Sequence, residues 1–182
     1  MKRIQAPLTK ETINSLKAGD LVLISGTIYT ARDAAHKKLD EMVFKGMPLP
    51  FELKGAVIYY VGPSPAKPGK PIGSAGPTTS SRMDSLTPAL LKAGLKGMIG
   101  KGRRSKEVRS AIRRHKAVYF AATGGAGALL GKRIKECDLI AFFELGTEAV
   151  YKLRVEDFPA VVINDCHGND LYEQVGGIKC YD

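Results

Sequence analysis

Residues 76–82, with the sequence Gly-Pro-Thr-Thr-Ser-Ser-Arg, concentrate groups that can bind an anion and move a proton. The stretch begins with a glycine and a conformationally restricted proline, continues with four consecutive hydroxyl side chains, and ends with a guanidinium. A hydroxyl both donates and accepts hydrogen bonds, and an arginine can hold a carboxylate through two parallel N–H groups. On local chemistry alone, the stretch is either an anion site or a Ser/Thr-rich turn that caps a helix.

Three further side chains could add charge to such a site. Arg32 and His36 are four residues apart, so they share one face of a helix predicted over 31–44. Lys101 stands between two glycines, directly after a strand predicted over 95–100. The plainer alternatives are a solvated arginine, a histidine that caps or packs, and an ordinary turn lysine.

The elements that position these residues alternate between strand and helix. We expect strands over 20–29, 54–62, 95–100, 117–122, 139–143, 150–155 and 160–165. We expect helices over 31–44, 84–95 and within 101–116, a capping box from Thr30 to Asp33, and a turn at 157–159. This order predicts an α/β class in which helices cover a sheet, organised as a single domain over 1–182.

Composition narrows the class of protein. No apolar run approaches the ~20 residues that cross a bilayer, and the N-terminus lacks the apolar core of a signal peptide, so we expect a cytoplasmic protein. Cys137, Cys166 and Cys180 are odd in number and widely spaced, which predicts neither a disulfide framework nor a metal site within this chain. The sequence leaves the roles of the three thiols open.

The formal charge of +10 concentrates in 101–116, where eight Lys or Arg residues accompany one acid, Glu107. Such a run could bind nucleic acid or an acidic partner subunit. No aromatic residues interleave with the charges, and Val108, Ala111 and Ile112 form an apolar stripe, which is typical of an amphipathic helix with a solvated basic face. The pattern therefore does not favour nucleic acid.

Four stretches in one order resemble the β region of the iron–sulfur hydro-lyases, which comprise class I fumarate hydratase and L-tartrate dehydratase. They are residues 30–36, 76–83, 100–102 and 144–149. The resemblance covers nearly the whole chain and implies a swivelling β/β/α fold with a mixed sheet. It also implies a [4Fe–4S] cluster held by a separate α subunit, a dicarboxylate substrate, an α2β2 assembly, and no activity for this chain alone.

The resemblance also assigns roles to residues. It implies that Arg32, Arg82 and Lys101 bind the substrate carboxylates and that Thr78 is a candidate base, although an unassisted threonine is a poor one. His36 would orient Arg32 or the substrate. Gly76, Thr79 and Ser80 would complete the substrate-binding set.

The substrate is fumarate or tartrate. The segment 144–149 is closer to the fumarate hydratase form and lacks the extra proline of tartrate enzymes, so the resemblance favours the hydration of fumarate to (S)-malate. Two other classes stay open: a basic nucleic-acid-binding module, and a regulatory domain that kept the fold without catalysis.

Overall fold

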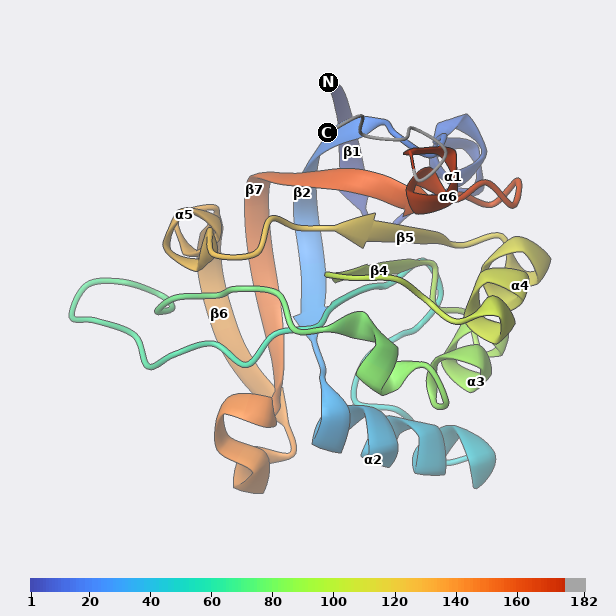
Figure 1. Cartoon of the computed structure of the whole chain (residues 1–182). Helices are drawn as coiled ribbons and strands as arrows, with labels where there is room; N and C mark the ends of the chain where they lie inside the picture. The colour runs from blue at the N-terminus through green and yellow to red at the C-terminus, as the bar shows by residue number, and fades with distance from the viewer. Residues whose placement is uncertain (176–182) are drawn as a thin grey trace, which may run out of the picture.

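Seven strands pair in the order β1-β2-β3-β4-β5-β7-β6 in the computed structural model, which describes residues 1–175 (Figure 1). The strands are β1 (Lys2–Ala6), β2 (Leu21–Thr30), β3 (Val57–Tyr59), β4 (Gly97–Gly100), β5 (Val118–Ala121), β6 (Ile134–Ala141) and β7 (Val150–Asn164). The helices are α1 (Lys10–Ser15), α2 (Asp33–Phe44), α3 (Thr87–Lys92), α4 (Lys106–His115), α5 (Gly127–Gly131) and α6 (Leu171–Val175), with 3₁₀ turns η1 (Ser80–Met83) and η2 (Phe143–Glu148).

Strands β1 to β5 run parallel to one another, whereas β7 is antiparallel to β2, β5 and β6. The sheet is therefore mixed, as predicted. Because parallel strands end at a common edge, the residues that follow β2, β3, β4 and β5 gather there. Open α/β sheets bind ligands in the crevice outside those carboxyl ends, so this edge is where a site is expected.

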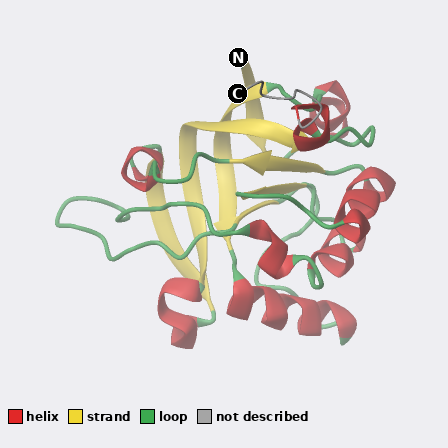
Figure 2. Cartoon of the chain, in the orientation of Figure 1, coloured by secondary structure: helices red, strands yellow, loops and turns green. Residues whose placement is uncertain are grey.

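Helices α2, α3 and α4 cover one face of the sheet (Figure 2). Their buried side chains, among them Leu39, Leu90 and Ile112, pack with Tyr60 and Tyr119 from the sheet. A second buried cluster contains residues of α1 and α5 on the opposite face. Neighbouring residues of a strand point to opposite faces, which is why adjacent aromatic positions of β3 and β5 divide between the two clusters. The expected sheet covered by helices is confirmed.

The turn predicted at 157–159 is wrong, because β7 continues through it. Asp157 adopts a φ of +48°, and the pairing with β2 shifts register there, so the irregularity is a β-bulge within one strand. A polar residue followed by a proline has the composition of a turn, yet long-range pairing holds the strand extended. Strand β1 and helix α1 were not predicted, and β3 is shorter at both ends than the predicted strand over 54–62.

The predicted capping box is also wrong. The Thr30 hydroxyl donates to the Ala149 carbonyl and accepts from the Tyr151 N–H, so it ties β2 to β7 instead of starting α2. The N-cap of α2 is Arg32, and the Glu148 carboxylate accepts the Ala34 N–H at the helix start. No helix within residues 1–175 has the length and apolarity required to span a bilayer.

Candidate active site

The stretch 76–82 docks onto the ends of β3 and β4, as irregular backbone up to Thr79 and then as the start of the 3₁₀ turn η1. The Thr78 N–H donates to the Tyr60 carbonyl at 2.7 Å, and the Ser80 N–H donates to the Lys101 carbonyl at 2.9 Å. The Lys101 N–H in turn donates to the Thr78 carbonyl at 3.3 Å. This short parallel bridge places the hydroxyl run beside Lys101, so two motifs that lie twenty residues apart meet at the strand ends.

Three hydroxyls of the run, those of Thr78, Thr79 and Ser81, make no hydrogen bond to another residue within 1–175. Thr78 is half-buried and Thr79 is exposed. The Lys101 side chain is exposed beside them, with Gly124 near its aliphatic stem. Unbonded hydroxyls and a cation therefore share one edge of the sheet.

Arg32 and Arg82 converge on one carboxylate. Asp33 Oδ2 lies 3.0 Å from Arg32 Nε, and Asp33 Oδ1 lies 2.7 Å from Arg82 Nε. Arg32 Nε also lies 3.2 Å from an oxygen of Glu148. Both arginines thus meet acids through Nε, and within residues 1–175 no hydrogen bond engages their Nη atoms. The Nη pair of each guanidinium can still bind a carboxylate in the bidentate manner.

The charge of Asp33 is stabilised in place. Burial acts to raise its pKa, but its own backbone N–H, the Arg32 side chain and the charge of Arg82 outweigh burial and lower the pKa below its usual value. Asp33 therefore remains ionised at neutral pH and holds the two guanidinium groups together.

A glycine provides the space for Arg32. A Cβ on Gly62 would lie 3.2 Å from Arg32 Nη1 and 3.3 Å from the Thr147 carbonyl oxygen. The loop after β3 and the turn η2 therefore enclose the Arg32 side chain, of which 21% is exposed. Figure 1 shows η2 beside the start of α2, although more than a hundred residues separate them in the sequence.

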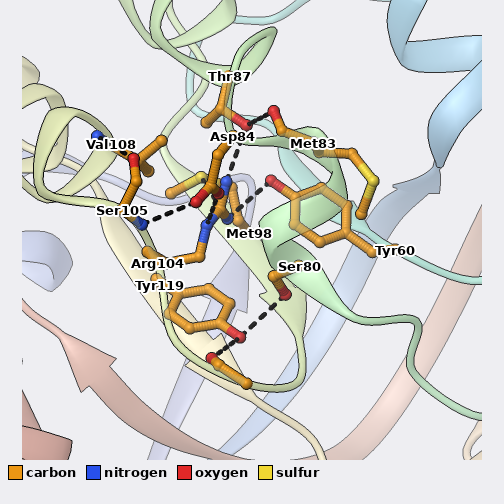
Figure 3. A network of polar contacts seen from close by, with 11 residues as sticks. Tyr60, Ser80, Met83, Asp84, Thr87, Met98, Arg104, Ser105, Val108 and Tyr119 are labelled. Carbon is orange, nitrogen blue, oxygen red and sulfur yellow. Dashed lines mark hydrogen bonds and ion pairs between the residues drawn. The ribbon is translucent and has the colours of Figure 1, made fainter.

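Arg104 anchors the loops that carry Arg82 and Lys101 (Figure 3). Its side chain is fully buried and donates to Asp84 at 2.7 Å, to the Tyr60 hydroxyl at 3.0 Å and to the Thr87 hydroxyl at 2.8 Å. Its guanidinium also lies 5.1 Å from the ring centre of Tyr119. The second Asp84 oxygen accepts the Ser105 N–H, so one ion pair joins η1, α3 and the start of α4.

Ser80 is part of this frame and is not a free ligand group. It is fully buried, and its hydroxyl lies 2.9 Å from the Tyr119 hydroxyl, which itself donates to the Gly102 carbonyl. Since the tyrosine proton is used, Ser80 is the donor to Tyr119. The Ser80 backbone N–H is also committed to Lys101, so the expected contacts of Ser80 with a substrate are replaced by structural bonds.

His36 lies behind the site. It is fully buried, its ring packs edge-on against Tyr60, and neither ring nitrogen has a hydrogen-bond partner among residues 1–175. Burial, reinforced by the charge of Arg104, lowers its pKa to about 3, so the ring is neutral. Asp33 and Glu148, rather than His36, contact the Arg32 side chain, and the expected role of His36 toward Arg32 or the substrate stays a prediction.

The glycine-rich turn after β5 serves packing. A Cβ on Gly127 would lie 2.9 Å from the Gly76 nitrogen and 2.4 Å from Ser74 Oγ. A Cβ on Gly131 would lie 2.7 Å from the Gly73 carbonyl oxygen. The two glycines of α5 therefore let the chain before Pro77 approach the helix closely, which positions Gly76 at the entry of the hydroxyl run.

Metal ligands are not grouped in the part of the chain that the structure describes. Within residues 1–175, no three His, Cys, Asp or Glu side chains lie close enough to hold a metal ion. Cys137 is half-buried on β6 and Cys166 is buried after β7, and both are free. Cys180 lies outside the described residues. These residues do not fit an iron–sulfur cluster, and no step through one follows from this chain.

Sequence reasoning missed the acids and the anchor of the site. The sequence pattern predicts only a helix-capping role for Asp33, and it predicts no role for Glu148 within the 144–149 motif. The adjacency of Asp33 to Arg32 was a usable signal. Arg104 carries no signal in the sequence, because it is one of eight Lys or Arg residues within 101–116.

Comparison with known proteins identifies relatives over almost the whole chain. The family model described as Fumarase C-terminus matches residues 2–175. The chain is 42% identical to the putative L(+)-tartrate dehydratase subunit beta of Methanocaldococcus jannaschii, covering 92% of this chain and 89% of that protein.

Two longer relatives are fumarate hydratases. The chain is 40% identical to the anaerobic class I fumarate hydratase of Escherichia coli (strain K12), covering 99% of this chain and 32% of that protein. It is 41% identical to fumarate hydratase 2 of Leishmania major, covering 94% of this chain and 31% of that protein. The chain thus spans about a third of the length of these two relatives.

Proposed function

This chain belongs to the Fumarase C-terminus family, and we propose on that basis that it is the β part of a hydro-lyase acting on a dicarboxylate. The proposed reaction is the reversible hydration of fumarate to (S)-malate, as the names of the two longer relatives suggest. The alternative is the dehydration of L-tartrate, which the name of the shorter relative suggests.

One observation carries this proposal. Asp33 draws Arg32 and Arg82 together through their Nε atoms and leaves their Nη atoms without hydrogen bonds to residues 1–175. Two such guanidinium groups, on the same sheet edge as Lys101, suit a small ligand with two negative ends, because each carboxylate can accept charge-assisted hydrogen bonds. A substrate carboxylate would add to a preformed cluster at little cost in side-chain entropy.

The Thr78 hydroxyl is the proposed proton-transfer group. It is half-buried, has no hydrogen bond to another residue within 1–175, and is fixed by backbone bonds to the ends of β3 and β4. A threonine hydroxyl needs a stronger base to take its proton. Thr79, exposed beside it, offers a further hydroxyl to the substrate. In the proposal, an acid of the α subunit assists Thr78.

The proposal assigns the [4Fe–4S] cluster to a separate α subunit. The shorter relative is named as a subunit beta and matches this chain over nearly its full length, whereas the fumarate hydratases are about three times longer. A separate β subunit and a β region within a longer chain are both compatible with an active site to which an α part and a β part contribute. An α2β2 assembly, a cytoplasmic location and the inactivity of the isolated chain remain part of the proposal.

The positions of the basic residues in 101–116 argue against nucleic-acid binding. Arg104 is buried in the anchor network, and Arg109 pairs with Asp170 and Glu173. The remaining cations of 101–116 do not lie beside exposed aromatic side chains of the same run.

Anaerobic reconstitution with the α subunit tests the function. The pair should form malate from fumarate, and Arg82→Ala or Lys101→Ala should lower kcat/KM by at least ~100-fold, equivalent to about 2.7 kcal/mol of transition-state stabilisation. Lys92→Ala, an exposed change on α3, is the control and should leave the rate unchanged. A reconstituted pair with an intact cluster that converts neither fumarate nor tartrate refutes the proposal.

A further inference from the structure

Residues 142–149 connect β6 to β7, and no step of the proposed reaction uses their side chains. They contain the turn η2, which lies against the start of α2 (Figure 1). Lys38 Nζ on α2 lies 2.7 Å from Glu144 Oε1 of the turn. The Thr30 hydroxyl, just before α2, donates to the Ala149 carbonyl at 3.2 Å. The turn is therefore docked along the first half of this helix.

Glu148 is the residue of the turn that contacts the candidate site. One of its carboxylate oxygens lies 3.2 Å from Arg32 Nε, and the other accepts the Ala34 N–H at 3.2 Å. Arg32 is the N-cap of α2, and its side chain makes no capping hydrogen bond, so the distant glutamate satisfies an N–H of the first turn. One carboxylate thus fixes both the arginine side chain and the start of the helix that carries it.

The two arginines of the site are held unequally. Asp33 pairs with both of them, whereas within residues 1–175 Glu148 pairs with Arg32 and not with Arg82. The Arg32 side chain is 21% exposed, and the Arg82 side chain is 52% exposed. Arg82 therefore has more freedom to adjust to a ligand, and Arg32 is the better fixed of the two. A group fixed before binding loses less side-chain entropy when the ligand arrives.

We infer that Glu148 is a positioning residue for the reaction, because it holds Arg32 in place to bind one carboxylate of the substrate through its Nη atoms. This role rests on the proposed function, since it requires a dicarboxylate at Arg32. Glu148 acts only through the arginine and touches no reacting atom. A carboxylate is charged in the substrate and in the product alike, so a weakened contact with it should appear mainly in KM.

Glu148→Gln tests this role in the reconstituted pair of α and β subunits. An amide has a single acceptor oxygen, so it can serve either the Ala34 N–H or Arg32 Nε, but not both. The variant should raise KM about tenfold for whichever dicarboxylate the pair converts, with kcat within about threefold of the wild type. Glu144→Gln is the matched control, because it makes the same change in the same turn but affects the pair with Lys38. It should leave KM and kcat within about twofold.

The Nε–H signal of Arg32 in the NMR spectrum of the full 182-residue chain gives a readout that does not depend on activity. The loss of one signal in Arg32→Lys assigns it. The signal should shift in Glu148→Gln, because a negative charge 3.2 Å from Nε is removed. It should stay in place in Glu144→Gln.

The outcomes separate this role from the proposed function. An active pair in which the two glutamine variants have equal KM values would overturn the role of Glu148 and leave the proposed function intact. An Arg32 signal that does not move in Glu148→Gln would also overturn it. A wild-type pair with an intact cluster that converts neither fumarate nor tartrate would refute the proposed function itself, and the positioning role would fall with it.

Discussion

Removing Arg104 should cost the protein more stability than any other single change in the basic run. The side chain is fully buried and donates three hydrogen bonds to oxygen acceptors, those of Asp84, Tyr60 and Thr87. Three bonds from a charged donor at roughly 1.5–3 kcal/mol each would sum to several kcal/mol. Part of this sum is offset, because Arg104→Met also removes the cost of burying a charge, and we expect a net loss of about 3–5 kcal/mol.

Urea unfolding at pH 7, followed by circular dichroism, measures this loss. Asp84→Asn should cost a similar amount, because it leaves the guanidinium buried without its counter-charge. The double variant, Arg104→Met with Asp84→Asn, should cost less than the sum of the single changes by at least about 1 kcal/mol, since the two residues interact directly.

Arg103→Met is the matched control. Arg103 directly precedes Arg104 in the sequence, and its side chain is exposed. Its cation–π contact with the Tyr172 ring predicts a loss of stability within about 1 kcal/mol. Additive single losses, or an Arg104→Met loss no larger than that of the control, would refute the anchoring role of the buried pair.

Three other changes test the frame of the site. Lowering the pH from 7 to 5 should cost about 2 kcal/mol through His36, because its pKa is about 3 in the folded chain and 6.5 for an ordinary histidine, so the unfolded chain binds the extra proton. In urea titrations, this pH-dependent loss should vanish in His36→Leu. Gly100→Ala would place a Cβ 2.0 Å from Ser80 Oγ and should cost about 1–3 kcal/mol by overpacking, with partial recovery when Ser80→Ala is added. Gly62→Ala crowds Arg32 and should lower kcat/KM of the reconstituted enzyme about tenfold while the unfolding free energy changes by less than ~1 kcal/mol; an unchanged kcat/KM would count against the seat assigned to Arg32.

The sequence predicted those residues of the candidate site that follow from local pattern, and their roles stay predictions. Thr78, Arg82 and Lys101 stand where a loop or a strand end could be read from glycine, proline and apolar runs. The structure brings the hydroxyl run to Lys101 at the strand ends. Arg32 was found in the same way, at the start of a helix whose periodicity is plain. The residue pattern of the strands and their alternation with helices along the sequence were sufficient to predict the α/β class.

Only the tertiary structure decided which charges are buried and what they contact. Glu148 contacts the start of α2 although more than a hundred residues separate them in the sequence. Arg104 has the same side chain as the exposed Arg103 before it and differs only in being buried against Asp84. The same holds for His36, which the helical spacing placed beside Arg32 but which the core encloses. Periodicity and spacing record local geometry, whereas burial and pairing depend on contacts between distant segments. The sequence therefore determined the cations of the candidate site, and the fold determined the carboxylates and the buried ion pair that hold them.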